Sequence, residues 1–502
     1  MKARQAIQKL TAYPVSPFSR KGKIRLDLNE STRGCSPAVL KAISNISPEE
    51  LNAYPDYGEL LTQLSAYYQI NEDQILLTNG ADDGIRAVMQ TFVEANDTVV
   101  LAHPTFGMIP IHARVVGASL HEVPYSMDLQ FPVDGYLKAL ASAPTLVTIV
   151  RPDSPTGALI SRESFCQIME KAGNAIVLLD ETYHHFCGES FVDLLSVYPN
   201  LLILQSFSKA WGLAGLRLGV VMGNPALITE IRKVNPPFSA NTLAVKAARA
   251  TLNDTSFLQQ VVEDVAVQKQ YLLKKMVQLN LKAVDTSANF ILVKVGDSAR
   301  EVQEQLLERK ILVKSLDSIP LLRGYLRVAI GTREELDIFL QALQEILPPE
   351  ALLFDMDGVL VDVSCSYREA IRKTASYFLG REVSVEEVEN YKRKVGYNND
   401  WDATETIIRE NGGIASREDI IDHFQRLYLG NSWDGLIREE KWLADNSLLK
   451  GLAQRFKLGI VTGRPREEAL FVLRLNKVLE LFETVICMED VPGRGKPHPD
   501  GI

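Results

Sequence analysis

The middle of the chain reads Ser206-Phe207-Ser208-Lys209-Ala210-Trp211-Gly212-Leu213-Ala214-Gly215-Leu216-Arg217-Leu218-Gly219, with one lysine among small hydroxyl residues. A short apolar run precedes it and leads directly into Asp180-Glu181-Thr182-Tyr183. Similar apolar runs, separated by helical patterns, occupy residues 75–78, 98–101, 145–150, 176–179, 201–204 and 218–222. Near-continuous apolar strands between helices predict an α/β fold whose mostly parallel sheet is covered on both faces.

Two of the chemically distinctive residues, Asp180 and Lys209, follow predicted strands. Ligands of a parallel sheet gather at the loops beyond the carboxyl ends of its strands. A lysine amine can condense with the aldehyde of pyridoxal phosphate (PLP), hydroxyl groups and the arginine at 217 can hold its phosphate, and a carboxylate can keep its pyridine nitrogen protonated. The combination therefore predicts a PLP enzyme.

The rest of the chain predicts a smaller domain and a second module. A helical pattern from about 240 to 280 is followed by predicted strands at 289–294 and 325–330, typical of a small α+β domain. Leu347-Pro348-Pro349-Glu350 ends the last helix, and a new apolar strand begins at Ala351. We expect a first domain at 1–347 (large part about 45–240, small part about 1–44 and 241–347) and a second at 350–502.

The amino-acid composition limits the classes of function that the protein can have. The net charge of −9 is spread along the chain without a basic block, which argues against nucleic acid or an anionic membrane as partner. The 5 cysteines are far apart and lack the spacing of a zinc site, as expected for a reduced compartment. No stretch approaches the roughly 20 apolar residues of a membrane span, and the first residues lead into no apolar signal segment. A cytoplasmic protein is the expectation.

Several motifs occur in the order found in one enzyme family. The first part of the chain resembles the fold-type I aminotransferases, most closely the histidinol-phosphate aminotransferase group, over roughly residues 10–347. The resemblance rests on the segments Leu28-Asn29-Glu30, Tyr54-Pro55-Asp56, 79–85, 104–108, Ser154-Pro155-Thr156-Gly157, 180–183, 206–219 and 326–333. It implies the PLP-transferase type I fold, with a large mostly parallel-sheet domain and a small α+β domain.

The resemblance also implies roles at the cofactor. Lys209 would bind PLP covalently and later move the substrate Cα proton, while Asp180 would pair with the pyridine nitrogen. Tyr183 would donate to the cofactor's phenolic oxygen, and Phe106 would stack on its ring. Taken alone, Lys209 could be a surface lysine, Asp180 a helix cap and Phe106 a core residue. The predicted phosphate cup comprises Ser206, Ser208, Arg217 and the backbone amides of Ala81 and Asp82 at a helix start.

Other implied roles concern the substrate and a second subunit. Tyr54 would reach the phosphate of the neighbouring subunit's cofactor, so a homodimer with shared active sites is expected. Arg327 would clamp the substrate carboxylate, because a planar two-pronged donor suits a carboxylate, and Asn29 would lie near the substrate. The expected partners are an amino donor and a 2-oxo acid, with no nucleic acid and no membrane.

Two positions depart from the family pattern. Ser154 stands where the family usually has an asparagine that hydrogen-bonds the phenolic oxygen. Lys314 aligns with the arginine that usually holds the substrate phosphate, and a lysine binds phosphate as a point charge without two parallel bonds. Histidinol phosphate with 2-oxoglutarate is the favoured substrate pair. An aromatic or other amino-acid aminotransferase, or a PLP decarboxylase of the same fold, remains the alternative.

The second module carries a different set of motifs. Asp355-Met356-Asp357-Gly358 follows an apolar strand, Thr462-Gly463-Arg464-Pro465 follows another, and Lys496-Pro497-His498-Pro499 comes later. This resembles the haloacid dehalogenase (HAD) superfamily, an α/β Rossmannoid fold, and implies a helical cap at about 366–445. Asp355 would be the nucleophile and Asp357 the general acid/base. Thr462 and Lys496 would orient the phosphoryl group, and Asp355 with the Asp357 carbonyl would hold Mg²⁺.

The printed chain ends at Ile502, six residues after Lys496, before the fourth HAD motif. We therefore expect an incomplete module with weak or no phosphatase activity, or a module that binds a phosphorylated metabolite in a regulatory role. The predicted fusion has a metabolic logic, because transamination to histidinol phosphate and its dephosphorylation are consecutive steps in histidine synthesis. That argument rests on pathway association alone.

Overall fold

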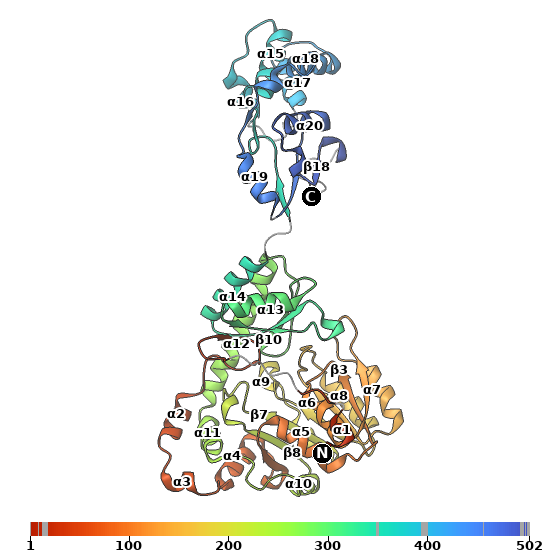
Figure 1. The fold of residues 1–502 in the computed structure, drawn as a ribbon, viewed down its shortest axis with the longest axis vertical. Helices are drawn as coiled ribbons and strands as arrows, with labels where there is room; N and C mark the ends of the chain where they lie inside the picture. The colour runs from red at the N-terminus through yellow and green to blue at the C-terminus, as the bar shows by residue number, and fades with distance from the viewer. Residues whose placement is uncertain are drawn as a thin grey trace. The chain divides into compact units, whose positions relative to one another are not determined.

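A computed structural model describes residues 2–8, 10–12, 19–347, 351–392, 400–454, 456–491, 496 and 498. The chain divides into two compact units, residues 1–347 and 348–502, and each is described by itself (Figure 1). The linker residues 348–350 and most of the predicted motif at 495–500 lie outside the described residues, although Lys496 is among them.

A seven-stranded sheet forms the centre of the first unit, in the order β2-β8-β7-β6-β5-β3-β4. The pairs among β3, β4, β5, β6 and β7 are parallel, whereas β8 runs antiparallel to both of its neighbours. The predicted mostly parallel sheet is therefore confirmed. The strands are β2 (Ile75–Thr78), β3 (Thr98–His103), β4 (Ser119–Pro124), β5 (Leu146–Val150), β6 (Ile176–Asp180), β7 (Leu201–Ser206) and β8 (Gly219–Gly223).

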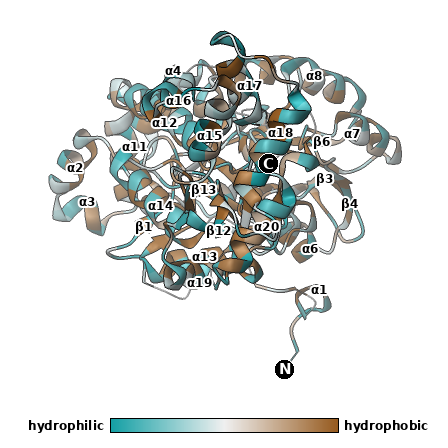
Figure 2. Ribbon diagram, turned by 90° about the horizontal axis from the view of Figure 1, so that it is seen from above, coloured by the Kyte–Doolittle hydropathy of each residue, from teal (hydrophilic) through white to brown (hydrophobic). Residues whose placement is uncertain are grey.

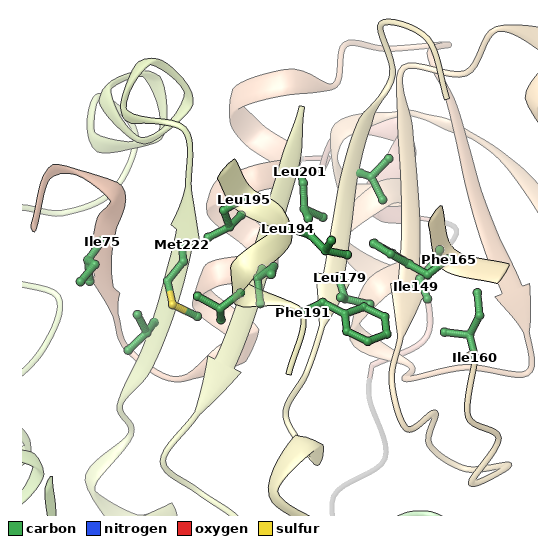
Figure 3. Close-up of a cluster of buried hydrophobic side chains, with 14 of the residues drawn as sticks. Ile75, Ile149, Ile160, Phe165, Leu179, Phe191, Leu194, Leu195, Leu201 and Met222 are labelled. Carbon is green, nitrogen blue, oxygen red and sulfur yellow. The ribbon is translucent and has the colours of Figure 1, made fainter. Parts of the chain in front are cut away.

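Alternate side chains of these strands enter two separate apolar cores, one on each face of the sheet. Leu179, Leu201 and Met222 belong to the core drawn in Figure 3, whereas Leu178 and Leu202 belong to the other. The first face is covered by α4 (Gly58–Tyr68), α7 (Val133–Ala139), α8 (Arg162–Lys171) and α11 (Thr242–Leu252). The second is covered by α5 (Ala81–Phe92), α6 (Met108–Val116) and α10 (Pro225–Arg232). Burial on both faces explains why these strands read as continuous apolar runs.

One strand of the large sheet was not predicted. β4 lies at the edge of the sheet, and only Val123 among its six residues is buried. Its sequence includes Ser119, His121 and Glu122, because an edge strand with exposed side chains needs no apolar run.

A smaller antiparallel sheet, β12-β13-β10-β9, forms the rest of this unit with a two-stranded pair β1-β11. Its strands are β9 (Ala283–Asp285), β10 (Phe290–Lys294), β12 (Lys314–Ser315) and β13 (Tyr325–Ala329), and the pair is β1 (Ile24–Arg25) with β11 (Ile311–Leu312). The longer helices here are α12 (Thr255–Gln278), α13 (Ala299–Glu308) and α14 (Arg333–Ile346). Thr332 and Glu335 form a reciprocal capping box that fixes the start of α14.

Short elements complete the first unit. They are α1 (Gln5–Gln8), α2 (Pro37–Ser44), α3 (Pro48–Asn52), η1 (Glu72–Gln74), η2 (Leu140–Ser142), α9 (His184–Cys187), η3 (Val192–Ser196), η4 (Ala214–Leu216) and η5 (Pro320–Leu322). Hydrophilic and hydrophobic stretches alternate along the helices, as expected where one side packs on a sheet and the other meets solvent (Figure 2). Within the described ranges, no helix combines the length and apolar character needed to cross a membrane.

The second unit has a parallel three-stranded sheet, β14-β17-β18, among its described residues. The strands are β14 (Ala351–Phe354), β17 (Lys457–Val461) and β18 (Thr484–Ile486), with α19 (Asn446–Ala453), α20 (Arg466–Leu475), η7 (Leu479–Leu481) and η8 (Met488–Asp490) beside them. A helical group lies between β14 and β17 in the sequence: α15 (Tyr367–Leu379), α16 (Val385–Lys392), α17 (Asp400–Glu410), α18 (Arg417–Leu429) and η6 (Leu436–Glu439) (Figure 1). Its two connections pair as β15 (Val361–Asp362) and β16 (Lys441–Trp442).

Candidate active site

Adjacent parallel strands bring the predicted cofactor residues of the first unit to one edge of the large sheet. Asp180 is the last residue of β6, and Ser206 is the last residue of β7. Ser154 follows β5, which pairs with β6 so that Val150 stands opposite Asp180. Because parallel strands end at the same edge, these side chains come from neighbouring loops.

Asp180 is a buried acid with little polar compensation. Its side chain belongs to a residue that is only 3% exposed, and the backbone amide of Thr182 donates to Oδ1 at 2.9 Å. Burial raises the pKa of Asp180 from 3.8 to about 6. Within the described residues Asp180 has no ion-pair partner, so the site offers a carboxylate to a cationic ring nitrogen.

Lys209 and Tyr183 lie together over this edge. Lys209 Nζ donates to the carbonyl oxygen of Leu28 at 2.8 Å and lies 5.6 Å from the centre of the Tyr183 ring. Burial disfavours ionisation of the Tyr183 phenol, but the positive charges of Lys209 and Arg327 outweigh it and lower the pKa of Tyr183. Asn29 Nδ2 donates to the Tyr183 oxygen at 2.9 Å. These contacts link the N-terminal segment to the lysine loop.

Arg327 reaches the same place from the smaller sheet. Its Nη1 donates to Ser154 Oγ at 3.0 Å, and its Nη2 donates to the Asp27 carbonyl at 2.7 Å. Arg327 Nε and Asn29 Oδ1 are buried polar atoms without a hydrogen-bond partner in the described chain. Unsatisfied buried donors and acceptors are costly, so each of these atoms marks a place where a polar ligand would bind.

A second cation stands beside Arg327. Lys314 on β12 is the direct partner of Arg327 on β13 in the antiparallel register. Partial burial lowers the pKa of Lys314, the charge of Arg327 lowers it further, and Asp27 opposes both. Two adjacent cations favour an anionic ligand group on this side of the site.

The predicted phosphate residues cluster around the start of α5. The helix begins at Ala81 without a side-chain cap, so its first amides have no side-chain acceptor. Arg217 Nη2 pairs with Asp82 Oδ2 at 3.0 Å, and Arg217 Nη1 lies 3.5 Å from Ser208 Oγ. Open helix amides, a hydroxyl and an arginine make a chemically suitable anion site.

Two further predicted residues make apolar or aromatic contacts. Phe106 packs at the edge of the apolar core on the α5–α6 face of the sheet. Tyr54 is 78% exposed and stacks on Phe238 with ring centres 4.3 Å apart. Within the described part of the chain, Tyr54 makes no hydrogen bond to the other predicted site residues.

The sequence did not reveal some of the neighbours. Asp153 is 1% exposed and accepts hydrogen bonds from Thr105, Tyr125 and Thr156, which fix the loop that carries Ser154. Burial raises the pKa of Asp153 to about 6. Asp27 also has a buried oxygen without a partner among described residues. The only available signal was position, because Asp153 and Asp27 adjoin predicted motifs.

The residues present therefore fit PLP. The first unit offers a buried acid that has no ion-pair partner among the described residues, uncapped amides at a helix start, unsatisfied atoms of Asn29 and Arg327, and the Lys209 amine. These are the groups needed at the ring nitrogen, the phosphate and the reacting end of that cofactor.

In the second unit, each predicted catalytic aspartate is paired with a cation. Lys496 Nζ lies 2.6 Å from Asp355 Oδ1, directly after β14. Arg464 Nε donates to Asp357 Oδ1 at 2.6 Å. Thr462 is 3% exposed and follows β17, next to β14 in the sheet. The structure thus brings together the predicted residues of this module.

The same region offers few possible ligands for a metal ion among the described residues. Among the residues that the structure describes, no group of three or more His, Cys, Asp or Glu side chains is arranged to hold a metal ion. Asp355 and Asp357 are only two residues apart and supply oxygen donors, the ligand type that Mg²⁺ prefers. A magnesium site at this loop remains a prediction.

Fold and site together define the first unit as a PLP-dependent transferase. The family model described as aminotransferase class I and II matches residues 21–343, and the chain belongs to this family. A second family model, described as haloacid dehalogenase-like hydrolase, matches residues 349–502, so a hydrolase domain of that type is present as well.

Curated relatives and solved structures agree with this assignment. A histidinol-phosphate aminotransferase of Caldanaerobacter subterraneus is 32% identical over 330 residues, covering 65% of this chain and 93% of the relative. One from Desulfitobacterium hafniense is 34% identical over 360 residues, covering 68% and 97%. The crystal structure of histidinol-phosphate aminotransferase from Sinorhizobium meliloti with pyridoxal-5'-phosphate has a TM-score of 0.64 at 25% identity, covering 69% and 97%. The predicted family and fold class are thereby confirmed.

Proposed function

We propose that the first unit transfers the amino group of a phosphate-bearing donor, of the histidinol-phosphate type, to 2-oxoglutarate. The observation that carries this proposal is the side-by-side placement of Lys314 and Arg327, of which Arg327 acts together with the Lys209 amine on the charge of Tyr183. The names of the curated relatives support the same substrate.

Each of the two substrates then has a cationic partner. The Arg327 guanidinium binds a carboxylate with two parallel hydrogen bonds, as in 2-oxoglutarate, and Lys314 provides a point charge for a phosphate. PLP, when bound, supplies an electron sink that stabilises negative charge at the substrate Cα. Lys209 Nζ takes the Cα proton and returns it, as a general base and acid.

Other residues would hold the cofactor. Asp180 keeps a proton on the ring nitrogen, because its carboxylate is buried and lacks a competing cation among described residues. Tyr183 and Ser154 would bind the phenolic oxygen, with Phe106 against the ring. Ser206, Ser208, Arg217 and the amides of Ala81 and Asp82 would bind the phosphate. We further propose a homodimer in which the exposed Tyr54 completes the partner's phosphate site.

A half-reaction screen tests the substrate. The PLP-loaded protein is mixed separately with L-histidinol phosphate, phenylalanine, tyrosine, aspartate and glutamate, and the cofactor absorbance is followed by stopped flow. Rapid conversion by histidinol phosphate and glutamate supports the proposal. Conversion only by unphosphorylated donors would reject it. A Lys314→Met variant is the matched probe. It should lower the rate of conversion by histidinol phosphate and leave the rate with glutamate unchanged.

A second candidate follows from Ser154. A serine is shorter than the usual asparagine, and Arg327 Nη1 already donates to its hydroxyl. With Lys314 unable to make two parallel bonds, the site also suits an aromatic or other amino acid without a phosphate. In the same screen, phenylalanine or tyrosine as the fastest donor would favour this general aminotransferase; carbon dioxide release would indicate a decarboxylase.

For the second unit we propose a phosphomonoesterase with the helical group at 366–445 as its cap. Asp355 attacks phosphorus, Asp357 protonates the leaving oxygen and then activates water, and Thr462 and Lys496 bind phosphoryl oxygens. Asp355 and the Asp357 carbonyl would hold Mg²⁺. Phosphate release from histidinol phosphate and p-nitrophenyl phosphate, with Mg²⁺ or with EDTA, tests this, and Asp355→Asn is the control. Saturable binding of histidinol phosphate without release would instead indicate a regulatory binding domain.

A further inference from the structure

We propose that Arg464 is a positioning residue. It joins the Asp357 carboxylate to the connection between cap and core, and so holds this carboxylate in one orientation relative to that connection. The inference rests on the phosphomonoesterase function proposed above and assigns a role to a residue outside its catalytic set.

Arg464 is one of the largest fully buried side chains, at 1% exposure. It follows β17 and Thr462, and its Nε donates to Asp357 Oδ1 at 2.6 Å. The Nη1 of the same guanidinium donates a hydrogen bond to Glu440 Oε2 at 2.9 Å. One side chain therefore contacts two carboxylates that are far apart in the sequence.

Glu440 belongs to the connection that returns from the cap. It lies between η6 and β16, and its side chain is 3% exposed. Its other oxygen accepts hydrogen bonds from Ser366 Oγ at 2.8 Å and from the Tyr428 hydroxyl at 2.9 Å. Ser366 immediately precedes α15, where the chain enters the cap, so Glu440 contacts both connections and helix α18.

Aromatic rings enclose this ion pair. The Arg464 guanidinium carbon lies 5.1 Å from the centre of the Tyr367 ring, which stacks on Tyr428 with ring centres 4.3 Å apart. An arginine suits the site because its planar head can serve two acceptors in different directions, stack on a ring and stay charged when buried.

The two carboxylates that Arg464 contacts differ in burial. A buried carboxylate such as Glu440 is stable only with a paired cation, so Arg464 cannot turn away from it without leaving a charge unpaired. Asp357, which is 38% exposed at its side chain, faces the open side of the site. The firmly held end at Glu440 thus fixes the guanidinium, and the guanidinium orients Asp357 for proton transfer.

Two variants separate this role from ordinary packing. Glu440→Gln keeps the volume and weakens the charge pair with Arg464, whereas Ser366→Ala removes another hydrogen bond to the same Glu440 carboxylate and leaves the Arg464 pair intact. Phosphate release from p-nitrophenyl phosphate with Mg²⁺ should show kcat about tenfold lower in Glu440→Gln, with KM unchanged. Ser366→Ala should match the wild type, and Arg464→Lys should resemble Glu440→Gln.

A second readout does not depend on turnover. Hydrogen exchange of the backbone amides at 356–360, in the full chain, should be about tenfold faster in Glu440→Gln and unchanged in Ser366→Ala. Equal effects of the two variants, in kcat or in exchange, would overturn the coupling through Arg464. If the wild type releases no phosphate, the proposed hydrolysis fails, and the exchange comparison alone decides the coupling.

Discussion

Replacing Gly219 with alanine should weaken PLP binding by crowding the loop that precedes α5. Gly219 begins β8, where it pairs with Thr78 on one side and Ser206 on the other. A Cβ atom at this position would lie 2.5 Å from the Gly80 carbonyl carbon, 2.7 Å from its oxygen and 2.8 Å from the Ala81 nitrogen. All three are backbone atoms, and Ala81 N belongs to the predicted phosphate cup, so no side-chain rotation can relieve the contact.

The magnitude follows from the cost of overpacking. An extra methyl group forced into a well-packed site costs about 1–3 kcal/mol. If the loop moves to relieve the clash, the Ala81 and Asp82 amides leave their position at the phosphate, and that cost appears in cofactor affinity. Since 1.36 kcal/mol is tenfold, the Kd for PLP should rise by about 5- to 150-fold.

The assay is a titration of cofactor-free protein with PLP, followed by absorbance, with thermal unfolding of the same samples. Gly223→Ala is the matched control, because its Cβ would lie 2.5 Å from Leu202 Cδ2 at the other end of the same strand. It should lower stability without changing the Kd for PLP. An unaltered Kd in Gly219→Ala, or equal losses in both variants, would refute the placement of the phosphate at this loop.

Three further changes should have distinct effects. Asp180→Asn should lower kcat of amino transfer by about 100-fold or more, measured in single turnovers, because an amide cannot hold a proton on the ring nitrogen. Arg327→Lys should raise KM for glutamate about tenfold in steady-state assays, since lysine cannot replace both guanidinium contacts, while kcat changes little. Asp153 has a pKa raised by burial to about 6, so the folded state binds its proton more tightly than the unfolded state. The free energy of unfolding of the cofactor-free protein should therefore decrease as the pH rises from 4 to 6, by about 3 kcal/mol for this group. Urea unfolding at pH 4.5 and 7 measures this decrease, which should be smaller in Asp153→Asn than in the wild type.

The large sheet was predictable because burial on both faces leaves a strong local signal. β7 is buried at all of its residues, and its first four, Leu201 to Leu204, are apolar. The edge strand β4 and the two-residue pair of β1 with β11 carry no such signal. The partners in that pair, Ile24 and Ile311, are also far apart in the chain, and loop lengths and local patterns do not specify such pairings.

The sequence likewise predicts some residues of the candidate site and does not predict their contacts. Lys209 and Asp180 could be predicted because each lies within a local motif at the end of an apolar strand. Their partners could not: the Leu28 carbonyl that Lys209 contacts is 181 positions away, and the Asp27 carbonyl that Arg327 contacts is 300 positions away. The Arg464–Glu440 pair likewise depends on tertiary packing, because a lone buried glutamate has no sequence signature.

Asp180 and Arg327 stand on different sheets of the first unit, and this separation has an evolutionary consequence. The acid that would serve every donor ends a strand of the large sheet, whereas the arginine and lysine that would distinguish donors belong to the small one. Substitutions near β12 and β13 can therefore alter the accepted donor while the inherited reaction chemistry stays intact. A family built in this way can diversify its substrates by changing a few residues of its smaller sheet.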